Sequence, residues 1–536
     1  GGATGPRPDA SGVLDVPFPG FGPPVDPYNP AQGVAFSGVE RDLFYLSLQT
    51  EWDIQGSGWT AVAAGAYRDD DRKTGSDSDH TSVNYISTAG GECGLCASER
   101  DDVSDYSVEL RLESPVQNRL RGLIGTYYFD QEIDGSDITF TDLDGGDVNE
   151  RETTKNWAVV AQLEYDILEN VTLGVEGRYF DEEKSLFQRR TTVDPTPTNE
   201  FDDSIDFSEF APRVTLDWRA TDDLLVYAIY AKGFKPGGLN GRPGATAVPP
   251  APTYDQEESD NYELGLKATL FDGRMTLNTS VFYIDVSDIQ LTTPLATGAA
   301  GTLTSIVTNQ GSGEVTGAEV EATLYLTDAI TVGATYALAD TEFTEGCDEF
   351  QWTLTSGGGI LNDAANCTGF DPNGEGDGSI KGNAFPLSSK NQFSAYADFR
   401  TAVFDAMEFF ATADVSYEDK KPVQVHNLAF VPEATILNAR LGIDTGTNVT
   451  ISIYGRNLTD EDAPSMVTRW LQDPLTTFQA VGQANFANIT GAGACTTTTC
   501  ARSYPRAFFG DMRRGRDFPT GACSSSDQGK SGAGRG

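Results

Sequence analysis

The sequence has few of the residues on which most enzyme and metal sites depend, and it has no long hydrophobic segment. Its 536 residues include only two histidines, His80 and His426, and four methionines. So few histidines leave little material for histidine-based catalysis or metal ligation. No segment approaches the roughly 18 apolar residues that a transmembrane helix needs. The strands of a membrane β-barrel carry a weaker hydropathy signal per segment, so this class of protein stays possible.

Positive charge is also in short supply. The chain has 37 Lys and Arg against 80 Asp and Glu, which gives a formal net charge of −43. Because phosphate binding requires a basic surface, we expect no nucleic-acid partner.

What the sequence does have is a repeated hairpin pattern, clearest between residues 254 and 291. Asp272-Gly273 separates two segments with a period of two residues, which predicts two antiparallel strands and a tight turn. In the second segment one face is apolar and the other is small and polar. The apolar face contains Met275, Leu277, Thr279, Val281 and Tyr283, and the polar face contains Thr276, Asn278 and Ser280. A soluble barrel has a greasy inside and a wet outside, whereas this pattern fits the reverse.

The same pattern recurs along the chain and predicts about 17 strands. They are Asp42–Asp53, Trp59–Arg68, Tyr106–Glu113, Leu120–Gln131, Trp157–Asp166, Thr172–Glu182, Phe210–Trp218, Leu224–Lys232, Tyr254–Leu270, Arg274–Gln290, Ser305–Leu326, Ile330–Phe343, Gln392–Arg400, Glu408–Tyr417, Thr435–Ile443, Val449–Asn457 and Ser503–Phe518. Short turns alternate with connections that are mostly long, including 69–103, 234–254, 346–385 and 458–503. Outer-membrane barrels have short periplasmic turns and longer extracellular loops, so the alternation indicates this class.

Aromatic residues bracket the apolar face at a spacing of eight. The pairs are Phe44/Trp52, Trp59/Tyr67, Trp157/Tyr165, Phe210/Trp218 and Phe409/Tyr417. Eight residues of a tilted strand rise roughly 20 Å, close to the height of a lipid-facing band between two aromatic girdles. On the opposite face lie charges of both signs, such as Glu109, Arg111, Glu176 and Arg178, which are costly in lipid and must face a wide polar lumen. The fold class predicted is therefore all-β, a transmembrane antiparallel up-and-down β-barrel.

Several segments, in this order along the chain, resemble the TonB-dependent outer-membrane receptors, in particular the proteobacterial siderophore or iron-complex receptors. They are YSVELRLESP (106–115), LIGTYYFDQE (123–132), NWAVVAQLEYDILENVTLGVEGRYFDEEKS (156–185), FAPRVTLDWRATDDLLVYAIYAKGFKPGGLNG (210–241), the hairpin at 254–291, VTGAEVEATLYLTDAITVGATYALADTEF (315–343) and YGRNLTDEDAP (454–464). The resemblance covers roughly residues 40–518.

The resemblance implies a 22-stranded barrel closed by an N-terminal plug domain. An odd strand count that starts and ends in the downward direction predicts that at least one strand precedes residue 1. We therefore expect the plug, the energy-coupling box and about five strands to be absent from this chain. The expected organisation is a Pro/Gly-rich loop at 1–38, a partial barrel at 39–518 and a low-complexity tail at 519–536.

Six of the seven cysteines are expected to form local disulfides, because they fall two to each predicted extracellular loop. The pairs are Cys93 with Cys96, Cys347 with Cys367, and Cys495 with Cys500, which leaves Cys523 in the tail. Cys93-Gly-Leu-Cys96 fits a redox or metal CxxC motif less well, since it has neither a partner motif nor a thioredoxin-like surrounding.

Two other motifs could be read as binding sites, but each has a simpler structural explanation. Asp69-Asp70-Asp71, with Asp77, Asp79 and His80, offers oxygen ligands for Ca²⁺ or an iron chelate, but acidic segments in loops are usually only solvated. Residues 233–238 (GFKPGG) look superficially like a phosphate loop but lack the helix that such a loop needs. In the resembled family this segment is a recurrent strand end. We expect neither a metal site nor a cofactor.

The function expected is that of an outer-membrane receptor that takes up a ferric siderophore or a similar bulky nutrient. In the resembled family a TonB-type periplasmic protein energises uptake, and the ligand class rests on that analogy alone, so vitamin B12, saccharides and aromatic compounds stay open. The expected partners are outer-membrane lipid, the energy-coupling protein and the chelate, with the protein a monomer in the bacterial outer membrane. The alternatives are a passive porin-like or adhesin-like barrel and an outer-membrane enzyme, for which no catalytic constellation stands out.

Overall fold

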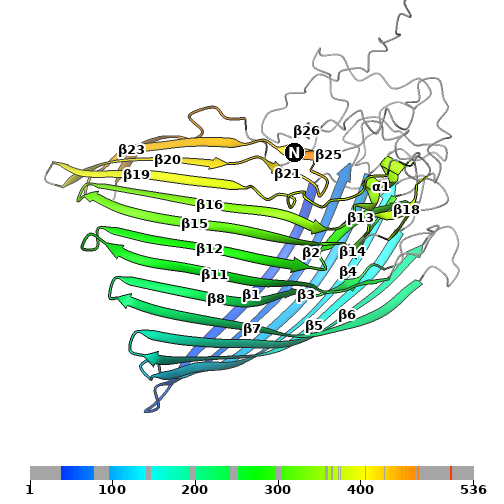
Figure 1. Ribbon diagram of the computed structural model, residues 1–536, viewed down its shortest axis with the longest axis horizontal. Helices are drawn as coiled ribbons and strands as arrows, with labels where there is room; N and C mark the ends of the chain where they lie inside the picture. The colour runs from blue at the N-terminus through cyan, green and yellow to red at the C-terminus, as the bar shows by residue number, and fades with distance from the viewer. Residues whose placement is uncertain are drawn as a thin grey trace, which may run out of the picture.

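The computed structural model describes residues 38–469, with internal gaps of which the longest are 78–95, 141–146, 192–199, 242–251 and 297–302, and also residues 507–509. In this part of the chain 16 strands form one antiparallel sheet, and each pairs with the next sheet strand along the sequence. The sheet curves strongly, so that β1–β6 lie behind β7–β16 in Figure 1. The fold is the wall of an up-and-down transmembrane β-barrel, as the period-two pattern predicts.

The strands of this sheet are long. Their bounds are β1 Gly38–Ile54, β2 Trp59–Asp77, β3 Cys96–Glu113, β4 Leu120–Phe140, β5 Asp147–Leu168, β6 Val171–Thr191, β7 Glu200–Thr221, β8 Leu224–Lys235, β11 Glu257–Leu270, β12 Met275–Ser287, β15 Ser312–Thr327, β16 Ile330–Glu345, β19 Asn391–Phe404, β20 Met407–Glu418, β23 Ala434–Asp444 and β24 Thr450–Gly455. They correspond to 16 of the predicted strands. The last predicted strand, Ser503–Phe518, lies outside the described residues except for β26, Ala507–Phe509, which pairs with β25, Val467–Arg469.

Several predicted boundaries are wrong; β7, for example, begins at Glu200 where Phe210 was predicted. The segment 69–103 was expected to be a polar loop, but β2 and β3 continue into it and pair as far as Asp77 with Cys96. The predicted strand Ser305–Leu326 is two strands, β14 (Leu303–Asn309) and β15, separated at Gly311, whose φ of 98° breaks the extended conformation. The strand predicted to start at Tyr254 is likewise β10 (Thr253–Tyr254) followed by β11. The period of two residues does not show the last two breaks, because the alternation of side chains continues from one strand into the next.

The short connections lie together at one end of the sheet and the long ones at the other (Figure 1). Between β11 and β12 the turn is the predicted tight one. Asp272 and Gly273 have φ of 56° and 85°, and the backbone N–H of Arg274 donates to the carbonyl of Phe271 at 3.2 Å. Positive φ at both central residues is a type I′ turn, whose twist matches that of the strands it joins.

The outer face of the sheet carries an aromatic girdle toward the long loops. Rings on neighbouring strands touch around the wall, with centroids 5.3–6.5 Å apart; the pairs are Phe44 with Tyr67, Tyr106 with Tyr128, Trp157 with Tyr179, Tyr230 with Tyr262, and Tyr262 with Tyr283. Most of these side chains are well exposed, as are the aliphatic ones between the two girdles, for example Leu163 and Leu264. Such a band is suited to lipid rather than water.

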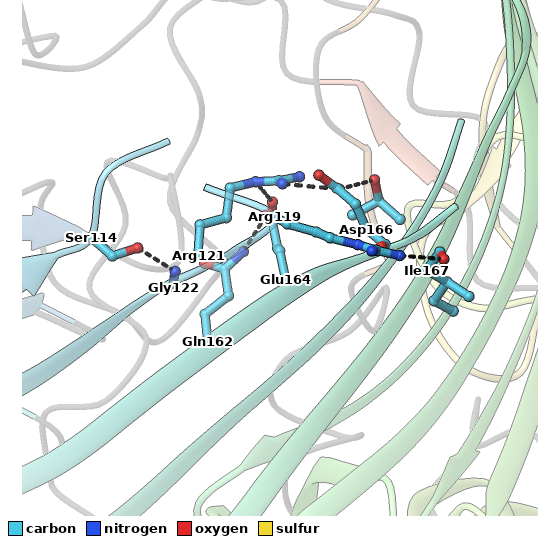
Figure 2. A network of polar contacts seen from close by, with 9 residues as sticks. Ser114, Arg119, Arg121, Gly122, Gln162, Glu164, Asp166 and Ile167 are labelled. Atoms are coloured by element: carbon cyan, nitrogen blue, oxygen red, sulfur yellow. Dashed lines mark hydrogen bonds and ion pairs between the residues drawn. The ribbon is translucent and has the colours of Figure 1, made fainter. Parts of the chain in front are cut away.

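The inner face is polar, and several of its charges are paired. Near the short turns Arg121 bridges two carboxylates, with Nε 2.7 Å from Glu164 and Nη1 3.0 Å from Asp166. Figure 2 shows this network, in which Arg119 also donates to the backbone oxygens of Asp166 and Ile167 at 2.6 and 2.8 Å. These contacts tie the start of β4 to the end of β5. They confirm that the face opposite the lipid-facing band is the charged one.

The long connections contain secondary structure of their own. Besides β10 and β14 they hold β9 Gly238–Leu239, β13 Gln290–Ala296, α1 Glu349–Ser356, β17 Ile360–Asp363, β18 Thr368–Phe370, β21 Lys421–Pro422 and β22 Phe430–Val431. No helix among the described residues is long and apolar enough to cross a membrane.

Candidate ligand-binding face

Four long connections gather at the loop end of the sheet, on the side where β13, β14, α1 and β21 lie in Figure 1. They are named here by the strands they join: the β8–β11 loop (236–256), the β12–β15 loop (288–311), the β16–β19 loop (346–390) and the β20–β23 loop (419–433). Because both ends of each loop are fixed in the sheet, these loops and the inner wall below them are the candidate site.

The first residues of the β8–β11 loop fold inward and lie against the inner wall of β6 and β7. Lys184 on β6 donates from Nζ to the backbone oxygen of Gly237 at 3.0 Å. A Cβ atom at Gly237 would lie 2.1 Å from the carbonyl oxygen of Tyr254 and 2.7 Å from Cζ of Phe207. Only glycine fits so close an approach. The GFKPGG segment is therefore the end of β8, a two-residue link against the wall and the start of β9, as expected of a strand end.

The β16–β19 loop is a small module built around a disulfide and one helix. Cys347 and Cys367 are bonded in the structure. Asp348 accepts a hydrogen bond at Oδ1 from the backbone N–H of Gln351 at 2.6 Å, which caps the N-terminus of α1. Trp352 on this helix is 5% exposed. The module therefore has a buried interior of its own, unlike a simple surface loop.

An apolar cluster joins this module to its neighbours. Ile289, Phe343 and Ile380 are 8%, 1% and 0% exposed. They come from the start of the β12–β15 loop, the end of β16 and the second half of the β16–β19 loop, and Val425 of the β20–β23 loop packs against them. Truncation of such a side chain typically costs 2–5 kcal/mol because it leaves a cavity.

Below the loops the inner wall borders a polar cavity of about 750 Å³. Hydroxyl and carboxylate groups line it, among them Tyr227, Glu263, Ser280, Glu319, Ser394 and Glu418. The Tyr227 hydroxyl donates to Oε1 of Glu263 at 2.6 Å. On the loop side, Lys421 donates to Glu418 at 2.8 Å, and this hydrogen bond lowers the pKa of the Glu418 carboxyl. The cavity offers hydrogen-bond partners to a polar ligand but no paired nucleophile and base.

Two of the three carboxylates in the acidic segment Asp69-Asp70-Asp71 contact arginines. Arg41 holds both oxygens of Asp70, from Nε at 2.6 Å and Nη2 at 2.7 Å, and Arg100 contacts Asp71 at 3.2 Å. The hydrogen bond from Arg41 lowers the pKa of the Asp70 carboxyl despite its burial. Asp70 and Asp71 are therefore paired with arginines on strands, where the sequence predicted an acidic loop. Asp79 and His80 lie outside the described residues.

The other cysteine pairs stay predictions. Cys93, Cys495 and Cys500 are outside the described residues, and Cys96 begins β3 without a described side chain. Residues 1–37 and 510–536, which include the expected tail, are outside them as well. Within the described chain no group of three or more His, Cys, Asp or Glu could hold a metal ion.

The sequence interpretation missed the residues that position the loops. Lys184, Asn240, Gln290 and Asn309 give no motif, because each binds backbone atoms that are distant in sequence. The one available signal was the cluster of glycines at 237–241, which indicates close backbone approach.

The fold and the loop face together define the class: a membrane-spanning β-barrel that presents structured loops above a polar lumen. Residues 2–458 match the family model for the TonB dependent receptor-like β-barrel. The chain belongs to the family of TonB-dependent receptors, whose members are outer-membrane β-barrels.

Among solved structures the chain is similar to the ferric yersiniabactin uptake receptor FyuA from Yersinia pestis, with a TM-score of 0.63 and 17% identity over 85% of this chain and 60% of that one. It is also similar to the siderophore receptor PiuA from Acinetobacter baumannii, with a TM-score of 0.57 and 17% identity over 79% of this chain and 61% of that one. At such identities the likeness shows the fold.

In sequence, the pesticin receptor of Yersinia enterocolitica is 31% identical over 170 residues, which is 32% of this chain and 24% of that protein. The probable TonB-dependent siderophore receptor PiuA is 22% identical over 293 residues, 54% of this chain and 34% of that protein. The chain thus spans a quarter to a third of the length of these curated relatives.

Proposed function

We propose that the protein is an outer-membrane receptor that takes up a ferric siderophore or a similarly bulky metal chelate, with energy from a TonB-type periplasmic protein. The observation that carries the proposal is the joined set of four loops above a polar cavity of about 750 Å³. A volume of this order accommodates a drug-sized ligand. The lining residues bind and orient a ligand without reacting with it, which is what a transport receptor requires.

The ligand class is supported by two of the similar structures, which carry ferric yersiniabactin uptake and siderophore reception in their names. The remaining parts of the proposal rest on analogy with the family. They are a plug domain and an energy-coupling box, a place in the bacterial outer membrane and a monomeric state.

Uptake assays with iron-labelled siderophores test the proposal. The full-length receptor is expressed in a strain that lacks its other siderophore receptors, with and without a functional TonB-type protein. Saturable uptake of at least one chelate that disappears without the energy-coupling protein is the expected result. Uptake that persists without this protein would instead indicate a passive porin-like barrel. A receptor that takes up no chelate of a hydroxamate, catecholate, carboxylate and thiazoline panel would contradict the ligand class.

A further inference from the structure

Three asparagines at the loop end make the same unusual contact. In each, the side-chain amide forms two hydrogen bonds with the N–H and C=O of a single residue in a different loop or strand connection. An amide that pairs in this way imitates the pairing of two β-strands and fixes both the distance and the angle between two chains.

The first two pairs join the β8–β11 loop to the β12–β15 loop. Asn240 donates from Nδ2 to the carbonyl of Val307 at 2.8 Å and accepts from its N–H at 2.7 Å. Asn309 accepts from the N–H of Asp255 at 2.7 Å and donates to its carbonyl at 2.9 Å. The pairs run in opposite directions, one asparagine from each loop, so the two loops hold each other at two points.

Gln290 adds a third contact between the same two loops. Its Nε2 lies 2.9 Å from the carbonyl oxygen of Pro236 and 3.1 Å from that of Asp255. Its backbone N–H donates to Oε2 of Glu257, the first residue of β11, at 2.8 Å. The start of β13 (Gln290–Ala296) is therefore anchored to both ends of the β8–β11 loop.

The third asparagine pair joins the other two loops. Asn427 in the β20–β23 loop accepts from the N–H of Ala384 at 2.8 Å and donates to its carbonyl at 2.9 Å. Asn383 beside it donates to the carbonyl of Val425 at 2.9 Å. The β16–β19 and β20–β23 loops are thus joined in the same manner as the first two.

The apolar cluster of Ile289, Phe343 and Ile380 connects the two joined pairs, because Ile289 belongs to the first and Ile380 to the second. The backbone N–H of Ile289 donates to the carbonyl of Gly311 at 3.0 Å, which closes the base of the β12–β15 loop beside the cluster. Lys184 holds the far end of the set to β6. The chain of contacts runs without a break from β6 to the β20–β23 loop.

We propose that the described parts of these four loops form a single rigid platform, held together by the asparagine–backbone pairs, so that they move as one unit instead of as independent flaps. If the loops are coupled, weakening one asparagine–backbone pair must also favour local opening at the other pairs. The coupling free energy must be the same whichever pair is weakened first. The consequence for ligand binding rests on the proposed function, whereas the mechanical coupling does not.

The test is amide hydrogen exchange on the full-length receptor in lipid nanodiscs, compared between wild type, Asn309→Asp and Asn427→Asp. The aspartate keeps the shape of asparagine but has no donor, and its charge faces the carbonyls that Asn309 contacts at Asp255 and Asp288. Asn170→Asp, at an exposed position in the turn between β5 and β6, is the matched control.

Asn309→Asp is expected to accelerate exchange about tenfold in 252–256 and 303–311, the effect of roughly one lost hydrogen bond. The platform predicts a parallel acceleration in 376–390 and 419–427. Asn427→Asp should accelerate exchange in these two segments and, in parallel, in 252–256 and 303–311. Acceleration confined to the mutated joint and its direct partner would overturn the platform in favour of independent flaps. Unchanged exchange in 123–129 of β4 shows that the barrel itself is intact in every variant.

A binding measurement keeps this inference separate from the proposed function. Both variants should weaken binding of whichever chelate the uptake panel identifies, by a similar factor, while Asn170→Asp should not. If exchange is collective but no chelate binds to the wild type, the platform stands and the proposed ligand class fails.

Discussion

Lys184 on β6 donates from Nζ to the backbone oxygen of Gly237 at 3.0 Å, and this contact holds the β8–β11 loop against the inner wall. The same ammonium group lies 3.3 Å from Oε1 of Glu182, which keeps it in place. A backbone carbonyl leaves no signal in the sequence, yet this contact helps to position the start of the β8–β11 loop.

Replacing this lysine should release the loop without harming the barrel. Hydrogen bonds to charged groups typically contribute about 1.5–3 kcal/mol, so Lys184→Met should accelerate amide exchange at 238–241 by at least about tenfold. Lys155→Met, at an exposed position on the outer face of β5, serves as the control. Equal exchange in wild type and Lys184→Met would show that the packing of Gly237 on Phe207 is sufficient by itself.

The disulfide of the β16–β19 loop gives a second prediction. Cys347 and Cys367 are separated by 20 residues, and a bridge across a loop of this size stabilises it by about 3 kcal/mol in the chain-entropy model. The double variant Cys347→Ser/Cys367→Ser should therefore become sensitive to limited proteolysis within 349–377, while the strands stay resistant.

Mass spectrometry of the unreduced protein checks the pairing itself. Linked peptides are expected for Cys347 with Cys367, and the local-pair prediction adds Cys93 with Cys96 and Cys495 with Cys500. Free thiols at these positions, or peptides linked between loops, would contradict it.

The strand wall was largely predictable from the sequence because successive side chains of a strand point to opposite faces. Every second residue therefore reflects the environment of one face. The alternation around Met275–Tyr283 identified a lipid face, and the eight-residue spacing of pairs such as Trp157 and Tyr165 identified its height. The turn at Asp272-Gly273 followed from the need for two positive φ values. These features are local, so a single sequence is sufficient to read them.

The candidate site was predictable only in outline. The loops were placed at the correct end, but the contacts that arrange them join Asn240 to Val307 and Asn427 to Ala384, pairs separated by 67 and 43 residues. Asparagine in a loop is usually a turn residue, and nothing near either position indicates a distant backbone partner. For the same reason the acidic segment at 69–71 gave a calcium alternative, since the partners Arg41 and Arg100 lie on neighbouring strands.

The two faces of β5 allow a matched test of which side meets lipid. Ala161 lies on the exposed outer face halfway between Trp157 and Tyr165, whereas Gln162 lies on the inner face, where its side chain donates to Glu164. Ala161→Arg should lower the free energy of unfolding by about 2–4 kcal/mol, the cost of a cation at the bilayer midplane. Gln162→Arg should change it by less than about 1 kcal/mol, because its charge faces the paired carboxylates of the lumen. Urea unfolding in lipid vesicles measures both, and similar values for the two variants would argue against the assignment of the faces.

The pair of Arg41 and Asp70 makes the anchoring of β1 depend on pH. Asp70 is 6% exposed, and the hydrogen bond from Arg41 lowers the pKa of its carboxyl below the ordinary value of 3.8. A carboxyl whose pKa is lower in the folded state stabilises that state fully above its unfolded pKa. The contribution is lost only as the pH falls through the folded pKa.

Asp70→Asn should therefore accelerate amide exchange in β1 at pH 7, after correction for the intrinsic rate, and have a much smaller effect at a pH below the folded pKa. Asp102→Asn, at a more exposed carboxyl on the neighbouring β3, is the control. An effect of Asp70→Asn that is the same at both pH values would mean that Arg41 binds the amide as well as the carboxylate, and that the charge of Asp70 does not anchor the strand.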